Sequence, residues 1–440
     1  MRGIMDNQRK IVSALFRTAI QSVSPYEKTK QVCSDIVREE ISGMGDAVII
    51  KVIGFGKAAC PMAKAAEECL QHHIDRGIIL TKYSHCRGYD FLRMDVYEAG
   101  HPLPDANGLR GTERVIDIIR GSDEHTLVLC LISGGGSSLL VAPHDGITLD
   151  EKQRATNLLL RAGADIQELN IVRKHLSRVK GGRLAEIAYP ARIISLILSD
   201  VIQDRVDTIA SGPTAPDASV YDDALFVLDK YGLVEKIPDA VRQILQKGAG
   251  GIIPETPKEG DAIFRNVQNI IIGSNSIALH AAQEKAKSLG FKSEILSGKI
   301  TGEARDTGVW LASVAREAQK NFGTQNQKGL CLISGGETTV TVKGSGLGGR
   351  NTELALSFAM AIEGIHGITL LSAGTDGTDG PTDAAGAIVD GTTVHKATAC
   401  GIDPHRFLED NDSYNFFKKT EGLFVTGPTG TNVMDIQIMI

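Results

Sequence analysis

The chain has 440 residues, of which 47 are basic and 53 acidic, so its formal net charge is −6. That length exceeds what one ordinary hydrophobic core supports and predicts two α/β domains. The chain has no basic stretch with interleaved aromatic residues, no apolar run of membrane-spanning length and no C-x-x-C pair among its 7 cysteines, so we expect a cytoplasmic protein without nucleic-acid or membrane partners.

The first half of the chain alternates between strand patterns and helical patterns. Residues 7–40 show apolar residues at helical spacing, and a β-branched strand at 47–53 leads through a glycine pair into an Ala-rich helix at 57–71. Further strands are predicted at 77–81, 94–102, 127–132 and 191–200, and further helices at 107–120 and 148–163. This β-α-β order predicts an α/β fold with a doubly wound, mostly parallel sheet that helices cover on both faces.

A Gly/Pro-rich polar segment at 247–262 is the predicted linker between two domains. We therefore predict one α/β domain at 1–250 and a second α/β domain at 251–440, with a ligand cleft between them. The strand–loop–helix plan recurs in the second domain, beginning with the stretch at 266–290.

The sequence GFGKAA follows a strand and opens a helix, as in the dinucleotide-binding fingerprint. That fingerprint also needs an acidic residue at the end of the next strand to hold a ribose hydroxyl, and here that strand ends in Thr81-Lys82. We interpret Gly54 and Gly56 as a phosphate-binding turn and Lys57 as a cation beside it, because the start of a helix attracts anions. The alternative is that Lys57 is a solvated helix side chain.

The strand at 127–132 runs into a loop rich in glycine and serine, and its hexapeptide CLISGG recurs at 331–336. Glycine lets backbone N–H groups turn toward an anion because it tolerates positive φ and has no side chain. Neither loop matches the G-x-x-x-x-G-K-[ST] phosphate loop, and no protein-kinase motif is present. The predicted nucleotide- or substrate-binding residues of the two loops are Ser133, Gly134, Gly135, Gly136, Ser137, Ser138, Ser334, Gly335, Gly336 and Glu337. Ordinary tight-turn chemistry is the alternative, which the repeat makes less probable.

Acidic residues are crowded on the loop TDGTDGPTD, which contains Asp376, Asp379 and Asp383. Such a loop suits a hydrated Mg²⁺, which takes one or two carboxylates together with substrate phosphates, and it also suits a general base. An ordinary polar turn is the alternative. Asp200 ends an apolar strand, and open α/β sheets bind ligands at the carboxyl ends of their strands. We therefore expect Asp200 in the cleft, and Asp376 and Asp379 are the candidate metal ligands.

Cations and one histidine complete the candidate set. Arg350 and Asn351 follow GSGLGG at a predicted helix start, and arginine suits bidentate binding of a carboxylate or phosphate. The run at 173–175, with sequence RKH, is denser in charge than a helix needs, although a solvated basic face explains it equally well. His101, between a glycine and a proline, either caps a turn or contacts a ligand.

These stretches together resemble the two-domain glycerate 2-kinases of the MOFRL type. The similar segments, in family order from residue 54 to 436, are GFGKAA, GHPLPDANG, LISGGGSSLL, NIVRKHLSRVKGGRLA, SDVIQDRVDTIASGPT, LISGGETTVTV, GGRNTELAL, SAGTDGTDGPTDAAGA, FLEDNDSYNFF and TGPTGTNVMDI. One departure is Gln203 in SDVIQD, where the family pattern leads us to expect glycine.

The resemblance implies that the chain phosphorylates D-glycerate at its 2-hydroxyl with ATP and a divalent metal such as Mg²⁺, giving 2-phosphoglycerate and ADP. It also implies a Rossmann-like N-terminal domain, a C-terminal MOFRL domain and an active site between them. By match to the motifs, Lys57 and Arg350 are the implied principal cations. One carboxylate, of Asp200, Asp376 or Asp379, would accept the hydroxyl proton while another carries the metal, and their individual roles stay open.

Two other functions stay open at this point. One is an NAD(P)H-dependent hydroxypyruvate reductase, which GFGKAA suggests and the missing ribose-binding acid argues against. The other is a non-catalytic regulator that binds a sugar phosphate, which the crowded acidic loop argues against. The oligomeric state is open as well, and a homodimer is one alternative.

Overall fold

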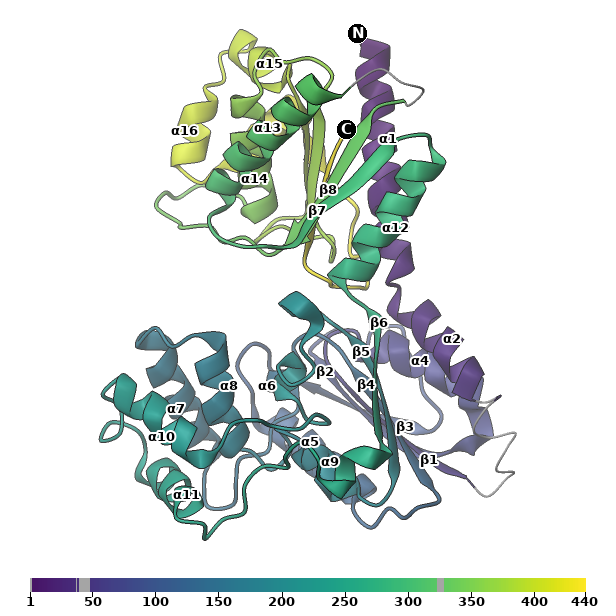
Figure 1. Cartoon of the computed structure of the whole chain (residues 1–440), viewed down its shortest axis with the longest axis vertical. Helices are drawn as coiled ribbons and strands as arrows, with labels where there is room; N and C mark the ends of the chain where they lie inside the picture. The colour runs from purple at the N-terminus through teal and green to yellow at the C-terminus, as the bar shows by residue number, and fades with distance from the viewer. Residues whose placement is uncertain (1, 37, 39–47, 323–327) are drawn as a thin grey trace. The chain divides into compact units, whose positions relative to one another are not determined.

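The computed structural model describes residues 2–36, 38, 48–322 and 328–440 (Figure 1). Two compact units are present, the parallel-sheet unit Pro25–Ile272 and the mixed-sheet unit, which combines Met1–Ser24 with Gly273–Ile440. The chain therefore passes between the units twice. These bounds differ from the predicted division at residue 250, because the N-terminal helix belongs to the mixed-sheet unit and a strand beyond residue 250 belongs to the parallel sheet.

The Gly/Pro-rich segment at 247–262, predicted as the linker, lies inside the parallel-sheet unit. Within it, Glu255 Oε1 accepts a hydrogen bond from the N–H of Tyr221 at 3.0 Å, and Thr256 Oγ1 donates to Asp217 Oδ2 at 3.0 Å. These bonds fasten the segment to its own unit. Its composition therefore marks an irregular connection within one unit and not a domain boundary.

The strands of the parallel-sheet unit are β1 (Ile49–Phe55), β2 (Ile74–Lys82), β3 (Met94–Ala99), β4 (Thr126–Ile132), β5 (Arg192–Leu198) and β6 (Val267–Gly273). They pair in the order β3-β2-β1-β4-β5-β6, and the first five run parallel to one another. Every residue of β4 is buried, as expected for a strand in a sheet that helices cover on both faces. The predicted parallel α/β sheet is confirmed.

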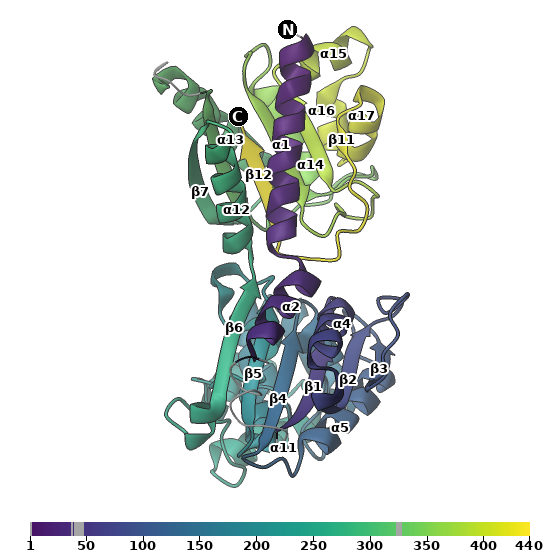
Figure 2. The ribbon, with the colours of Figure 1, turned by 90° about the vertical axis from the view of Figure 1, so that its right-hand side faces the viewer.

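Helices cover both faces of this sheet because alternate strand residues point to opposite sides. The helices are α2 (Pro25–Ile36), α4 (Ala59–Leu70), α5 (Ala106–Ile119), α6 (Gly136–Leu139), α7 (Leu149–Arg161), α8 (Ile166–His175), α9 (Arg183–Ala188), α10 (Tyr221–Lys230) and α11 (Asp239–Ala249), with 3-10 turns η3 (Gln71–His73), η4 (Ile202–Asp204), η5 (Ile209–Ser211) and η6 (Ala262–Asn266). In one core, α2 and α4 pack on Leu127, Leu129 and Leu131 of β4 (Figure 2). In the other core, α5 and α9 pack on Val128 and Cys130. The doubly wound arrangement is confirmed.

Four helices, α7, α8, α10 and α11, form a cluster of their own within the unit (Figure 1). Its core includes Leu159 and Tyr221. The first of these helices begins with a capping box. Thr148 Oγ1 accepts from the N–H of Glu151 at 3.2 Å, and Glu151 Oε2 accepts from the N–H of Thr148 at 2.8 Å. This box fixes the start of the helix that carries Lys152.

The strands of the mixed-sheet unit are β7 (Lys292–Ile300), β8 (Leu330–Gly336), β9 (Thr369–Gly374), β10 (Gly386–Asp390), β11 (Leu423–Phe424) and β12 (Asp435–Met439). Their order is β11-β10-β9-β12-β8-β7. β7 and β8 run parallel, whereas β12 runs antiparallel to both β8 and β9. The last strand of the chain is therefore inserted between two earlier strands.

Helices cover both faces of the mixed sheet as well. They are α1 (Arg2–Ser22), α12 (Asn275–Ser288), α13 (Ala304–Asn321), α14 (Arg350–Ala361), α15 (Thr393–Ala399), α16 (Pro404–Glu409) and α17 (Ser413–Thr420). In Figure 1, α1 and α12 lie on one side of the sheet and α13 and α14 on the other. Thr431 Oγ1 donates to Val23 O at 3.0 Å, and Arg9 Nη2 donates to Ile388 O at 3.0 Å, which ties α1 to this unit. Among the described residues, no helix has the length and apolar character that a membrane crossing requires.

Candidate functional site

The loop at 133–138 lies at the carboxyl end of β4, between the ends of β1 and β5. Strand order reverses between β1 and β4, and open α/β sheets bind ligands at such a point. Gly135 has a φ of 82°, which a residue with a side chain rarely adopts. Among the described residues, we find no hydrogen bond donated by the N–H groups of Gly134 and Gly135. These N–H groups are therefore available to an anion.

Three side chains from different segments meet this loop. A Cβ atom on Gly134 would lie 2.9 Å from Asp200 Cγ and overlap one carboxylate oxygen. A Cβ atom on Gly135 would lie 2.9 Å from His101 Nε2 and 3.5 Å from Lys57 Cε. Lys57 follows β1, His101 follows β3 and Asp200 follows β5. The structure thus brings Lys57 and Asp200 to the predicted loop together with His101, the histidine of the candidate set.

Lys57 and His101 differ in charge. Burial, together with the positive charges of Lys57, Lys82 and His85, lowers the pKa of His101 to about 4. The imidazole is therefore neutral at pH 7 and can donate one hydrogen bond and accept another. The side chain of Lys57 has neither a hydrogen bond nor an ion pair within the described residues, so its charge is available to a ligand.

The glycine turn before Lys57 is closed and does not form an open phosphate site. The N–H of Lys57 donates to Gly134 O at 2.9 Å, and the N–H of Ala58 donates to Ser133 Oγ at 3.0 Å. The donors that a phosphate would use at the start of α4 are therefore taken by the neighbouring loop. Gly54 lies inside β1, and Gly56, with a φ of 127°, allows β1 to approach Ser133. The structure gives both glycines a packing role.

We expect Gly56→Ala to destabilise the fold by about 1–3 kcal/mol, the usual cost of overpacking. Its Cβ atom would lie 2.7 Å from the carbonyl carbon of Ser133, and the positive φ adds strain. Gly54→Ala is the matched control, because its Cβ atom would lie 3.6 Å from Ala59 Cβ, an ordinary contact. Urea denaturation of both variants measures the difference. Equal stabilities would contradict the packing role of Gly56.

The second copy of the hexapeptide has a different structure from the first. Ser334, Gly335 and Gly336 are residues of β8, paired with Gln437, Ile436 and Asp435 of β12. Ser334 Oγ donates to Gln437 Oε1 at 3.0 Å and is buried. The prediction of a second open loop at 334–336 is therefore wrong, because a distant strand extends β8 through these residues.

Neighbouring segments approach both glycines of this strand so closely that no side chain fits at either position. A Cβ atom on Gly335 would lie 2.8 Å from Asn275 Cγ, and one on Gly336 would lie 2.8 Å from Ile300 C. The next N–H, of Glu337, donates to Ile300 O at 2.8 Å. These contacts hold the end of β8 to neighbouring segments of its own unit, and they leave Glu337 as the first side chain beyond the strand.

Arg350 begins α14 and is held by two carboxylates. Its Nε and Nη2 donate to Asp435 at 2.6 and 3.0 Å, and Nη1 donates to Glu337 Oε1 at 2.6 Å. Burial disfavours its charge, but the carboxylates of Asp435 and Glu337 outweigh burial and raise the pKa of Arg350. The described residues accept from three of its five N–H donors, so two remain for a ligand. The sequence predicted Arg350 but gave no indication of Asp435.

The side chains of Asn351 and Asp379 are buried and hydrogen-bonded to each other. Asp379 Oδ1 accepts from the backbone and side-chain nitrogens of Asn351, and Oδ2 accepts from the N–H and Oγ1 of Thr352. Asp379 is only 1% exposed, and burial raises its pKa. Asn351 Oδ1 accepts from Ser372 Oγ at 2.8 Å. Asp379 therefore caps the start of α14, and the geometry does not fit its predicted role as a metal ligand or that of Asn351 as a ligand-binding residue.

Asp376 is the better candidate of the acidic loop for a cation. Its Oδ1 accepts from the N–H of Thr378 at 3.0 Å, while Oδ2 accepts no hydrogen bond from the described residues. Asp383, by contrast, accepts from Tyr414 Oη at 2.7 Å. No group of three or more histidine, cysteine or acidic side chains that could enclose a metal ion occurs in the described part of the chain. The residues therefore fit an open, hydrated site with one carboxylate.

The segment after Asp200 explains the departure at Gln203. This residue has φ 70° and ψ 8°, a left-handed conformation that favours glycine. The family pattern thus expects glycine where the backbone requires positive φ, and the glutamine here keeps the same turn.

Sequence reasoning missed the buried lysines beside the 133–138 loop. A cavity of about 360 Å³ is lined by Gly135, Ser137 and Ser138 of the loop together with Lys152, Arg173 and Lys180. Of these cations only Arg173 stood in a run that the sequence marked as dense in charge. The burial of Lys152 and Lys180 had no sequence signal, because it depends on the packing of α7 beside the loop.

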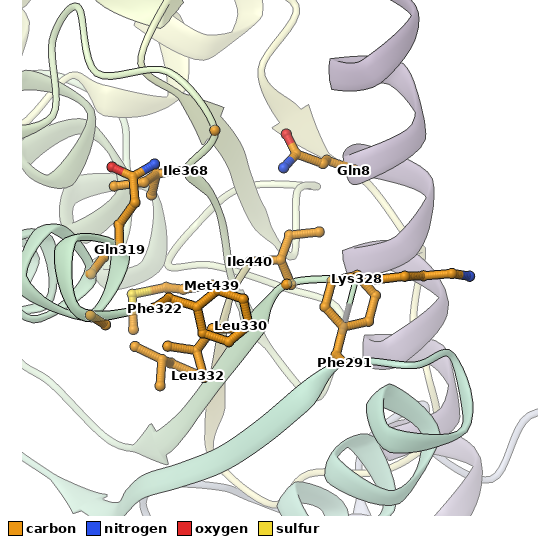
Figure 3. Close-up of a pocket in the computed structure, with 14 residues that line it drawn as sticks. Gln8, Phe291, Gln319, Phe322, Lys328, Leu330, Leu332, Ile368, Met439 and Ile440 are labelled. Carbon is orange, nitrogen blue, oxygen red and sulfur yellow. The ribbon is translucent and has the colours of Figure 1, made fainter. Parts of the chain in front are cut away.

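A second pocket, of about 180 Å³, lies in the mixed-sheet unit at the opposite end of β8 from Gly336 (Figure 3). Apolar side chains of Phe322, Leu330, Leu332 and Met439 gather in it. None of the predicted site residues lines this pocket.

Comparison with known proteins gives consistent matches over the whole chain. Residues 11–246 match the family described as a domain of unknown function, DUF4147, and residues 330–435 match the MOFRL family. A Thermotoga maritima protein named D-glycerate 2-kinase is 46% identical over 435 residues, with 98% of each chain covered. A crystal structure of glycerate kinase from Thermotoga maritima matches with a TM-score of 0.89 and 45% identity, covering 99% of each chain.

Two further relatives have names that differ from each other in the activity they state. A Pyrococcus horikoshii protein named glycerate 2-kinase is 42% identical over 437 residues, covering 98% of this chain and 97% of the relative. An Agrobacterium vitis protein, named only provisionally as a hydroxypyruvate reductase, is 40% identical over 391 residues, covering 88% of this chain and 86% of the relative.

Proposed function

Because this chain belongs to the family of glycerate 2-kinases that carry the MOFRL domain, we propose that it transfers the γ-phosphoryl group of ATP to the 2-hydroxyl of D-glycerate. The observation that carries the proposal is the loop at the end of β4. Its two available N–H groups, the unpaired ammonium of Lys57 and the carboxylate of Asp200 occur together there. Phosphoryl transfer depends mainly on such positioning and charge neutralisation.

The residues can be given roles in a balanced reaction. The 2-hydroxyl oxygen forms a bond to the γ-phosphorus while the bond from that phosphorus to the bridging oxygen breaks, and ADP leaves with the bridging oxygen. Asp200 takes the hydroxyl proton, and Lys57 with the N–H groups of Gly134 and Gly135 neutralises charge on the phosphoryl oxygens. Arg350, by its match to the family motif, is the second cation.

A divalent cation belongs to this chemistry, because metal ions neutralise the charge of the nucleotide phosphates. Mg²⁺ keeps several water ligands and takes one or two carboxylates, which fits Asp376 with its one available oxygen. We assign the metal to Asp376 and not to Asp379, whose acceptor positions are filled. When bound, the ion supplies positive charge beside the phosphates.

The structure favours this reaction over hydride transfer from a nicotinamide cofactor. A dinucleotide site needs open N–H groups at the start of the first helix and an acid at the end of the second strand. Here the N–H groups of Lys57 and Ala58 are bonded to the neighbouring loop, and β2 ends at Lys82.

The direct test is incubation with ATP, D-glycerate and Mg²⁺ while ADP is followed. We expect ADP release only with all three, loss of release on chelation of the metal, and recovery when Mg²⁺ is restored. Enolase added alone then distinguishes the product, since it converts 2-phosphoglycerate and not 3-phosphoglycerate. Oxidation of NADH with hydroxypyruvate is the control, and that oxidation without ADP release would overturn the proposal.

A further inference from the structure

The cavity beside the 133–138 loop is lined by cations that have no acidic partner in the described part of the chain. Lys152 is 6% exposed and Lys180 is 2% exposed, yet no aspartate or glutamate is among the residues that line the cavity. Lys180 Nζ donates to Ser137 O at 2.7 Å, to Ser137 Oγ at 3.1 Å and to Ala210 O at 3.3 Å. Lys152 Nζ donates to Leu176 O at 3.0 Å. All of these acceptors are neutral.

Two other cations close to Arg173 in sequence have acidic partners, which makes the contrast informative. Lys174 pairs with Asp217 at 3.1 Å, and Arg178 pairs with Glu113. Arg173, in the same run, has neither an ion pair nor a hydrogen bond within the described residues and lines the cavity. Lys174 and Arg178, which do not line the cavity, are thus paired with carboxylates, whereas no carboxylate is among the residues that line the cavity.

Burying these cations without a counterion is unfavourable in the protein without a bound ligand. Burial, with the charges of Arg173 and Arg178, lowers the pKa of Lys152 to about 7, and burial lowers the pKa values of Lys180 and Arg173 as well. A charge without a counterion in such surroundings is costly, and a bound anion would remove the cost. The cavity is therefore built for a ligand with several negative charges.

Part of the cavity lining is apolar. Pro102, Leu103, Pro104, Val141 and Leu160 are among the lining residues. Leu103 is 63% exposed and Leu160 is 51% exposed, so apolar surface is left uncovered at the cavity. Its volume of about 360 Å³ falls in the range of sites for ligands larger than a three-carbon acid.

Accepting the proposed kinase function, we infer that this cavity is the nucleotide site of the enzyme. The base lies against the apolar side chains of the lining, and the polyphosphate lies along Arg173, Lys180 and Lys152 toward Gly135. D-glycerate has one carboxylate and no apolar portion of comparable size, so it matches neither the several cations nor the apolar side chains of the lining. Because Gly135 lines the cavity and also meets Lys57, the terminal phosphate would reach the loop where transfer is proposed.

The inference is tested by titration calorimetry of ADP with three proteins: the wild type, Arg173→Gln and the control Arg154→Gln. Arg173 has no partner among the residues that the structure describes, so its replacement should leave folding intact. Arg154 is exposed on the same helix as Lys152. We expect Arg173→Gln to raise the Kd for ADP on the order of 10- to 100-fold, the range for losing a charge-assisted contact. Arg154→Gln should leave it unchanged.

Steady-state kinetics separates the possible ligands. Arg173→Gln should raise the KM for ATP and leave the KM for D-glycerate unchanged. A rise for D-glycerate alone, unchanged ADP affinity, or no binding of ADP to the wild type would each overturn the inference. Failure of the proposed function looks different: ADP would bind in an Arg173-dependent way, but D-glycerate would yield no ADP from ATP. Lys180→Met, checked for folding by circular dichroism, should repeat the Arg173 result.

Discussion

Lys57→Met is expected to lower kcat for ADP release by about 10²–10³-fold, the scale for loss of one charge-stabilising donor, while Tm stays unchanged. Activity falls because the ammonium group, beside Gly135, meets the developing charge of the phosphoryl group. Stability is spared because the ammonium group has no partner within the described chain and methionine keeps the apolar stem. Kinetics and thermal unfolding of the same preparation measure both effects.

The titration of His101 gives a readout of this variant that does not depend on activity. The charge of Lys57 contributes to the low pKa of His101, which is about 4. Its loss should raise that pKa partway toward the ordinary value, while burial keeps it low. Histidine NMR signals report the shift. Lys64→Met, on α4, is the control and should change neither kcat nor the titration. Near-normal kcat in Lys57→Met would contradict the catalytic role.

The parallel sheet was predictable because its strands are encoded locally. Apolar runs at 47–53 and 191–200 appear as β1 and β5 within a few residues, since a strand buried on both faces needs little beyond a continuous apolar run. The loop with Ser133 was predictable for the same reason: it follows directly on such a run. Lys57 and Asp200 then came together because parallel strands place their carboxyl ends at one edge.

The hexapeptide CLISGG does not by itself determine whether its last residues form a loop or a strand. At Ser133 it leads into a loop, and at Ser334 the same letters stay in a strand. What differs is β12, close to the end of the chain, which pairs with β8 up to Gly336. A partner strand that arrives from a distant part of the chain leaves no mark in the hexapeptide itself.

Residue roles that depend on burial could not be predicted from the sequence either. Asp379 and Asp376 stand in nearly identical surroundings in TDGTDG, yet Asp379 caps α14 and Asp376 keeps an available oxygen. Lys152 has the sequence context of an exposed first-turn residue but is buried beside the glycine loop. Only the packing of helices that are separate in sequence decides these roles.

Arg350→Met is expected to cost about 3–5 kcal/mol of stability as well as activity, unlike Lys57→Met. Asp435 is 1% exposed and receives two of the donors of Arg350, so the variant leaves a buried carboxylate without its counterion. Urea denaturation measures the loss. We expect kcat to fall by about 10²–10³-fold if the two remaining donors of Arg350 bind a ligand.

The stability that Arg350→Met loses should increase as the pH rises. Burial raises the pKa of Asp435 to about 6 even against the opposing effect of Arg350, and removing the guanidinium raises it further. The folded variant then binds a proton more readily than the unfolded chain, so its stability falls as pH rises through this range. Arg350→Met should be least destabilised near pH 4 to 5 and most destabilised above pH 7.

The double variant Arg350→Met/Asp435→Asn separates the two roles of Arg350. With no charge left buried, most of the lost stability should return and the pH dependence should disappear. If Arg350 contacts the substrate, kcat stays low in this variant although the fold is restored. Recovery of kcat together with stability would instead make Arg350 a positioning residue, and a single variant as stable as the wild type would contradict the pairing with Asp435.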